Sequence, residues 1–141
     1  MAGAIKRYDF GPVTFEVNAA VVGGTLVEPD GTTGKVKTAT AGTAVCLGIA
    51  ETDAIPTATD QNISATNILL SPIGPYVAVA SEGFYDIEYA AACVAGAKVK
   101  VAANGTVTPW VSGTDASGLI VGICYIAATG ATQKRLTKLT L

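Results

Sequence analysis

The sequence contains no histidine, and only 14% of its 141 residues are charged. A serine or cysteine nucleophile activated by histidine is excluded, because no imidazole is present to accept the proton. The three cysteines, Cys46, Cys93 and Cys124, are far apart and form no CxxC pair, so a zinc site is not indicated. Each lies in an apolar run, which predicts a buried thiol. We expect no enzyme activity, no metal ion and no cofactor.

The chain also lacks a basic excess and a long apolar run. Nine basic and eleven acidic residues give a net charge of −2, which is unsuited to neutralising phosphates, so we expect no nucleic-acid partner. No run of about 18 apolar residues is present to cross a membrane. The first residues, MAGAIKRYDFG, lack the apolar core of a signal peptide. We therefore expect the chain to fold in a cytoplasm.

Alanine, glycine, threonine and valine dominate the sequence instead. Valine and threonine favour pleated surfaces, and glycine marks turns and bulges, so this composition predicts an all-β fold, a small β-barrel or β-sandwich. The length fits a single domain. We expect an extended N-terminal arm over residues 1–12 and one β domain over 13–141, with an excursion loop at 53–67.

Alternation of apolar and polar residues predicts the strands. VTFEVN at 13–18 is half-buried, and TLV at 25–27 and KVKT at 35–38 flank a Pro-Asp-Gly turn. TAVCLGIAET at 43–52 and GLIVGICYIAAT at 118–129 are expected to be buried strands. Their central glycines, Gly48 and Gly122, predict a bulge or a close backbone approach.

Asn104-Gly105 is the strongest short hairpin signal in the chain. A two-residue loop would place Lys100 opposite Pro109. A three-residue loop over 103–105 places Val101 opposite Val107 and Val99 opposite Pro109, so that apolar residues meet. Because a shift of one residue inverts both faces of a strand, we predict the three-residue loop, with Gly105 in the left-handed region.

Three further local patterns have structural interpretations. PYVAVASEGFYDIEYA at 75–90 predicts a hairpin that turns at Glu82-Gly83. The alanine-rich YAAACVAG predicts one short helical turn that ends at Gly96. Lys134, Arg135 and Lys138 make the last strand basic, which is typical of an edge strand protected against aggregation; the alternative is contact with an acidic partner surface.

Two parts of the sequence resemble one another. VVGGTLVEPDGTTGKVKTATAG and CVAGAKVKVAANGTVTP share the order of a small-residue turn, a strand, a glycine-bearing turn and a second strand. Matching Gly23 to Gly96 and Gly48 to Gly122 gives offsets of 73 and 74 residues. This near-constant offset predicts a duplicated β unit, at about residues 19–52 and 92–128, whose copies share one core.

Few residues suggest chemistry. Asp86 and Glu88 share one strand face, and Glu51 and Asp53 repeat this arrangement; both pairs are typical of a solvated surface. The single tryptophan, Trp110, follows a strand and could cover the core rim or lie at a subunit contact. The arm carries apolar, basic and aromatic residues without a role in a core, so it could bind another subunit. The candidate contact residues are Ile5, Lys6, Arg7, Tyr8, Phe10 and Trp110.

The sequence resembles the capsid decoration, or cement, proteins of tailed bacteriophages. The resemblance lies in GGTLVEPDGTTGKVKTATAGTAVCLGIAETDA, YVAVASEGFYDIEYAAACVAGAKVKVAANGTVTP and IVGICYIAATGATQKRLTKLTL, and it begins at about Ala19. It implies a small β-barrel or β-sandwich, made in the host cytoplasm, that binds the outside of an expanded phage head as a homotrimer. Its partners would be the major capsid protein and itself, and it would stabilise the shell by bridging capsid subunits. The alternative interpretation is a β-sandwich adhesion or carbohydrate-binding module, although aromatic residues make up only 6% of the chain.

Overall fold

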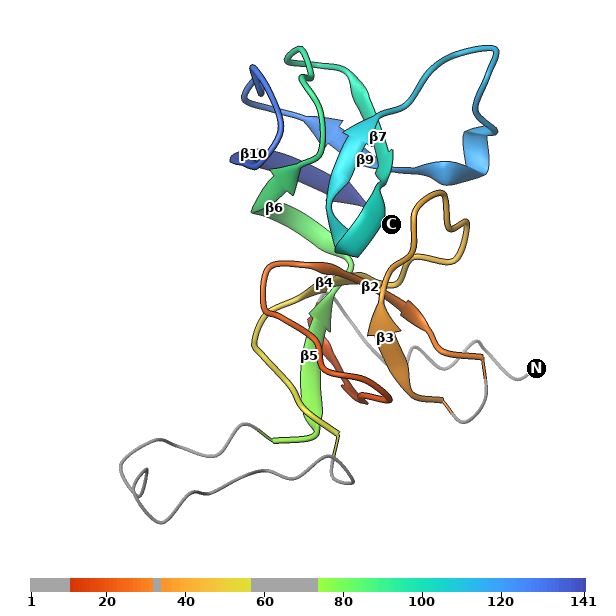
Figure 1. The fold of residues 1–141 in the computed structure, drawn as a ribbon, viewed down its shortest axis with the longest axis vertical. Coiled ribbons are helices and arrows are strands. Elements are labelled where there is room, and N and C mark those ends of the chain that lie inside the picture. The colour runs from red at the N-terminus through yellow and green to blue at the C-terminus, as the bar shows by residue number, and fades with distance from the viewer. Residues whose placement is uncertain (1–10, 32–33, 57–73) are drawn as a thin grey trace, which may run out of the picture.

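The computed structural model consists of two β units that lie one above the other along the long axis of the molecule (Figure 1). The structure describes residues 11–31, 34–56 and 74–141. Helical structure within these ranges is limited to two single 3₁₀ turns, η1 (Ala103–Gly105) and η2 (Ser117–Leu119). The prediction of an all-β fold is confirmed.

The first unit, in red to light green in Figure 1, is a five-stranded sheet with the order β1-β5-β4-β2-β3. Its strands are β1 (Val13–Glu16), β2 (Leu26–Pro29), β3 (Val36–Thr38), β4 (Gly48–Ala50) and β5 (Tyr76–Ala80). Val17, Val27, Ala50 and Val79 belong to its own buried apolar cluster. The strand predicted at 43–52 corresponds to β4, which is only three residues long because the chain before Gly48 forms a loop.

The second unit, in green to blue, is a closed barrel with the order β10-β6-β8-β7-β9. Its strands are β6 (Glu82–Tyr89), β7 (Lys98–Val101), β8 (Val107–Pro109), β9 (Ile120–Cys124) and β10 (Gln133–Thr140). Of the two predicted architectures, barrel and sandwich, the barrel is the one that forms. The buried hydroxyl groups of Tyr89 and Thr137 lie 2.7 Å apart inside it and form a hydrogen bond, so neither is left unsatisfied in the core.

The two units have the same topology. In the barrel, β6 meets β8 through one parallel pair, Tyr89 with Val107. In the first unit, a parallel bridge between Val17 and Val36 joins the two ends of the sheet in the same way. The next residue along, Ala90 or Asn18, donates its backbone N–H to the carbonyl of that same valine in each unit. The two units thus repeat one topology over their whole length, as the predicted duplication requires, and not only over residues 19–52 and 92–128. The expectation that the two copies share one core is wrong, because the buried apolar residues form two separate clusters.

Hydrogen bonds also correct the alignment of the two copies at one position. Gly24 donates its N–H to Ala50, and Gly96 donates its N–H to Cys124, with both glycines at a φ of 85°. The equivalent of Gly96 is therefore Gly24, not Gly23 as the sequence alignment predicts. Only a residue without Cβ adopts this left-handed conformation at little cost, so the turn geometry decides the match.

The central glycines of the two repeats are confirmed as places of close backbone approach. A Cβ at Gly48 would lie 2.2 Å from the carbonyl oxygen of Ala80, and one at Gly122 would lie 2.3 Å from that of Lys138. The strands β4 and β9 therefore approach β5 and β10 more closely than any side chain would permit.

The predicted three-residue hairpin between β7 and β8 is also confirmed. Val99 pairs with Pro109 and Val101 with Val107, and Gly105 has a φ of 68°. Asn104 adopts the left-handed conformation as well, at a φ of 58°. Apolar pairing across the two strands therefore selected the correct loop length.

Three local predictions are wrong. The predicted hairpin at 75–90 does not form, because β5 pairs with β1 and β4 whereas β6 pairs with β10 and β8. The chain instead passes from the first unit to the second at Ser81. The helical turn before Gly96 is absent, because the N–H and C=O groups of Cys93 pair with Ala128 across the barrel. The basic strand β10 is not an edge strand, since β6 and β9 flank it.

The two units contact each other through a row of apolar side chains on the outside of the first unit. We name this set the docked row; it consists of Leu26, Ala39, Ile49 and Ala80. All four are buried in the cluster that fills the barrel of the second unit. Two backbone hydrogen bonds cross the junction, from Gly105 to Ala39 at 3.1 Å and from Gly42 to Val101 at 3.0 Å. That residues 13–141 unfold as a single domain stays a prediction.

Other predicted segments fall partly outside the described residues. The N-terminal arm is described only from residue 11, and the excursion loop at 53–67 only as far as residue 56. At the start of that loop, Ala54 still pairs with Val21, and the N–H of Ile55 donates to Gly74. Residues 54 and 55, at the start of the predicted loop, are thus bonded to the first unit, and the rest of the prediction lies outside the described residues.

The close approach at Gly122 gives a stability prediction. Replacing Gly122 with alanine is expected to lower the free energy of unfolding by about 1–3 kcal/mol or more, because the new Cβ would push β9 away from β10. The control is Gly118→Ala, where the Cβ would meet open space, and its expected change is within about 1 kcal/mol. Denaturant unfolding measures both variants. Equal stabilities of the two variants would show that β9 and β10 can separate without cost.

Candidate functional site

The predicted contact residues of the arm cannot be located in the structure. Ile5, Lys6, Arg7, Tyr8 and Phe10 all lie outside the described residues. Their role in binding another subunit stays a prediction.

Trp110 lies on the rim of the second unit and is half-buried. Its indole N–H donates to the carbonyl of Ala116 at 2.9 Å, and its backbone N–H donates to Lys98. The ammonium group of Lys98 lies 5.6 Å from the centre of the indole ring, within the range of a cation–π interaction. Trp110 therefore attaches the loop that follows β8 to the barrel wall.

The same loop is held by an ion pair. The ammonium group of Lys100 lies 2.6 Å from a carboxylate oxygen of Asp115, and the backbone N–H of Val111 donates to the other oxygen at 2.8 Å. The hydrogen bonds from Lys100 and from the Val111 backbone hold the pKa of Asp115 below its usual range. The loop from Trp110 to Ala116 is thus fastened at both ends.

The carboxylates singled out by the sequence do not converge. Asp86 is exposed and Glu88 half-buried on the outside of β6, opposite Leu136 and Lys134 of β10. Glu51 accepts a long hydrogen bond of 3.5 Å from the hydroxyl of Tyr85, and Asp53 accepts one of 2.7 Å from the N–H of Gly23. Burial, and to a lesser extent the nearby charge of Glu51, raises the pKa of Tyr85. Glu51 and Asp53 therefore each bind a local partner, whereas Asp86 and Glu88 lie on an outer strand face.

Glu28 is the one acidic residue that is buried in the described part of the chain. Its carboxylate accepts a hydrogen bond from the hydroxyl of Thr40 at 3.0 Å and lies 3.5 Å from the ammonium group of Lys37. Burial on its own raises the pKa of Glu28, but hydrogen bonds from Thr43 and Thr40, together with the charge of Lys37, outweigh it. The pKa of Glu28 is therefore held below its usual range.

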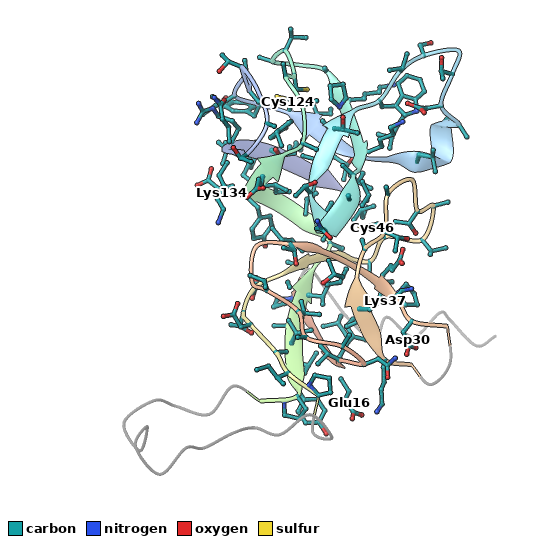
Figure 2. All side chains as sticks on the ribbon, viewed as in Figure 1. Glu16, Asp30, Lys37, Cys46, Cys124 and Lys134 are labelled. Carbon is teal, nitrogen blue, oxygen red and sulfur yellow. The ribbon has the colours of Figure 1, made fainter. Side chains whose placement is uncertain are left out.

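The three thiols are free; Cys93 and Cys124 are buried as predicted, whereas Cys46 is only half-buried. Cys93 and Cys124 are buried inside the second unit, and Cys46 lies beside the junction of the two units (Figure 2). Burial raises the pKa of Cys46 to about 11 and that of Cys93 to about 12. Thiols in this state are poor nucleophiles and poor metal ligands.

Two exposed aromatic side chains on the barrel were not selected from the sequence. Phe84 and Tyr125 are 53% and 62% exposed, and their rings meet edge to face with centroids 5.4 Å apart. Phe84 pairs across the sheet with Lys138 of β10. The alternation of FYDIEY does contain the signal, because it places Phe84 on the same outward face as Asp86 and Glu88.

Beside Phe84, four side chains form a line across the outside of β10, β9, β7 and the end of β8. We name this set the exposed row; it consists of Lys138, Ile123, Lys98 and Trp110. Lys138 pairs with Ile123, Ile123 pairs with Lys98, and Lys98 lies over Trp110. This row is the best candidate for a binding surface in the described residues, because it combines exposed apolar groups with two cations.

Other types of site find no support among the described residues. They contain no group of three or more histidine, cysteine, aspartate or glutamate residues placed to hold a metal ion. They also contain no helix that is long and apolar enough to cross a membrane.

Comparison with known proteins identifies the fold. No protein-family model and no curated protein matches the sequence. Among solved structures, the N base of the head fiber gp8.5 in bacteriophage phi29 has the same fold, with a TM-score of 0.63 and 14% sequence identity. The match covers 92% of this chain and 92% of that one, so it includes both β units. At this identity the likeness shows the fold alone.

The state of the thiols predicts slow labelling of the native chain. With a pKa of about 11, Cys46 is about 0.1% thiolate at pH 8, and burial further limits access to it. A disulfide reagent such as DTNB is expected to label far less than one thiol per native chain within minutes, and all three after denaturation. Rapid release of one equivalent of the coloured thiolate of DTNB per native chain would contradict this prediction, if the Cys46→Ser variant does not show it.

The environment of Glu28 predicts a pH dependence of stability. Because its pKa is lowered in the folded state, its stabilising contribution is present above the unfolded value of 4.5 and is lost as the pH falls through the folded value. Glu28→Gln is expected to cost about 1–3 kcal/mol at pH 7 through its charged hydrogen bonds, and much less at pH 3.

Denaturant unfolding at both pH values measures this difference. The control is Glu16→Gln, which removes a half-exposed ion pair to Lys35 and is expected to cost at most about 1 kcal/mol at pH 7. A Glu28→Gln penalty that is as large at pH 3 as at pH 7 would exclude the charge of Glu28 as its cause.

Proposed function

We propose that this chain is a virion structural protein that binds the outer surface of a phage capsid and stabilises the shell by bridging major capsid subunits. One observation carries the proposal. The head fiber N base of bacteriophage phi29 shares the fold over 92% of both chains, including the two-unit arrangement. The sequence resemblance to phage cement proteins points independently to the outside of a phage head.

The architecture suits a role in binding protein surfaces. Two closed β units in line present long outer faces, and the described residues place exposed apolar side chains on both, such as Tyr76 on the first unit and Phe84 on the second. A module that contacts several capsid subunits makes each later contact intramolecular, so modest interfaces add up through effective concentration. In the proposal the protein acts as a homotrimer, which multiplies the number of contacts on a shell.

The ionisable groups support a structural role rather than catalysis. Asp86 and Glu88 lie on an outer strand face, whereas the carboxylate of Glu28 is occupied by Thr40 and Lys37. Acid–base catalysis requires titratable groups that converge on a substrate with matched pKa values. The proposal therefore includes no enzyme activity and no cofactor.

The carbohydrate-binding alternative is not favoured by the exposed aromatic pair. The rings of Phe84 and Tyr125 meet at an interplanar angle of 81°, so they form no flat platform on which a sugar ring could stack.

The proposal predicts binding to phage heads. The purified full chain is expected to form a symmetric oligomer and to co-sediment at micromolar concentration with expanded shells that lack it, from the phage that encodes it. Imaging of the decorated shells is expected to show density on their outer surface, and the decorated shells are expected to withstand heating better than bare ones. Shells already saturated with the protein are the control. No binding to bare expanded shells would refute the proposal.

A further inference from the structure

The two units place equivalent residues in different environments, and this difference identifies a surface. The hydrogen bond from the N–H of Ala39 to Leu26 in the first unit corresponds to that from Trp110 to Lys98 in the second. Ile49 pairs with Leu26 and with Ala80 in the first unit. In the second, Ile123 pairs with Lys98 and with Lys138. The exposed row therefore occupies the same place on the second unit as the docked row occupies on the first.

The docked row is buried by a protein surface. Leu26 is fully buried and Ile49 is 2% exposed, because the barrel of the second unit covers them. On the second unit, the equivalent Ile123 is 37% exposed and Lys98 is exposed. Within the chain, this face of the first unit thus binds the second unit. The equivalent face of the second unit has no partner within the described residues.

Side-chain changes between the two rows indicate what the second partner is like. Leu26 and Ala80 of the docked row are replaced by Lys98 and Lys138 of the exposed row, and Ala39 is replaced by Trp110. Neither Lys98 nor Lys138 has a carboxylate within ion-pair distance in the described part of the chain, where the ion pairs involve Lys35, Lys37 and Lys100. Phe84 and Tyr125 extend the apolar area beside Lys138.

We infer that the exposed row, together with Phe84 and Tyr125, is the surface through which this protein binds a capsid subunit. The complementary surface presents carboxylates to Lys98 and Lys138, and apolar side chains to Ile123 and the aromatic residues. Cations placed between apolar groups fix the register of such an interface and disfavour partners without matching carboxylates. This inference rests on the proposed function, because it names the binding surface for the shell.

The test compares two lysines of one strand. Lys138 and Lys134 both lie on the outside of β10 and are exposed, but only Lys138 belongs to the exposed row. Lys138→Glu is expected to weaken binding of the full chain to bare expanded shells by about ten-fold or more, whereas Lys134→Glu, with the same charge change, shifts it by less than about two-fold. Co-sedimentation of the chain with shells over a concentration series measures the affinity of each variant.

A second pair of variants tests the apolar part of the surface. Phe84→Ser is expected to weaken binding by about ten-fold, and Val94→Ser, at a position that is 72% exposed outside this surface, is expected to have little effect. Thermal melting shows that each variant is folded. If Lys138→Glu does not fold, Lys98→Glu replaces it, with the same expected loss of binding.

The possible outcomes are distinct. If the unchanged chain binds shells and both Lys138→Glu and Phe84→Ser bind equally well, the inference is wrong while the proposed function stands. If the unchanged chain does not bind shells, both fail. If Lys138→Glu instead changes the molar mass of the free protein in light scattering, the row binds a second copy of the chain, and the inference is overturned. Loss of shell binding in both variants, with unchanged molar mass and normal control variants, supports it.

Discussion

Both units depend on one place where two strands come too close for a side chain. In the first unit the backbone of Gly48 lies against the carbonyl of Ala80, and in the second Gly122 lies against that of Lys138. Five strands of three to eight residues can close on themselves only by bending sharply, and a glycine at the tightest contact permits the bend. Closure then leaves few free strand edges, which protects short strands from pairing with other chains. The repeated position of this glycine is therefore the physical basis of the repeated fold.

The two units share this backbone but differ in the side chains that determine how each unit packs. Where Val17 and Val79 fill the first core, the equivalent Tyr89 and Thr137 fill the second and satisfy each other through a buried hydrogen bond. On the outside, the small and apolar docked row lets the first unit close against the second, whereas the exposed row carries lysines and an indole ring. The same backbone positions thus provide an internal interface in one unit and an open surface in the other.

The chemistry of the molecule is concentrated on its surfaces rather than in its interior. Burial raises the pKa values of Cys46 and Cys93, and the buried carboxylate of Glu28 is held by two threonines and a lysine. Because a fold alone does not specify function, the proposed binding role depends on the outer faces and on the partners that match them.

The sequence by itself determined the strand character of the chain, the duplicated unit and the hairpin at Asn104-Gly105, because alternation, glycine spacing and apolar pairing are local properties. It failed where a distant segment decides the outcome. The alanine-rich stretch before Gly96 pairs with Ala128 instead of forming a helical turn, and β10 is flanked by β6 and β9 instead of forming an edge. Residues 76–89 alternate as a hairpin would, yet they separate at Ser81 because β5 pairs within the first unit and β6 within the second. Tertiary structure alone also decided that Ile49 is buried and Ile123 exposed, since identical residues at equivalent positions differ only in what packs over them.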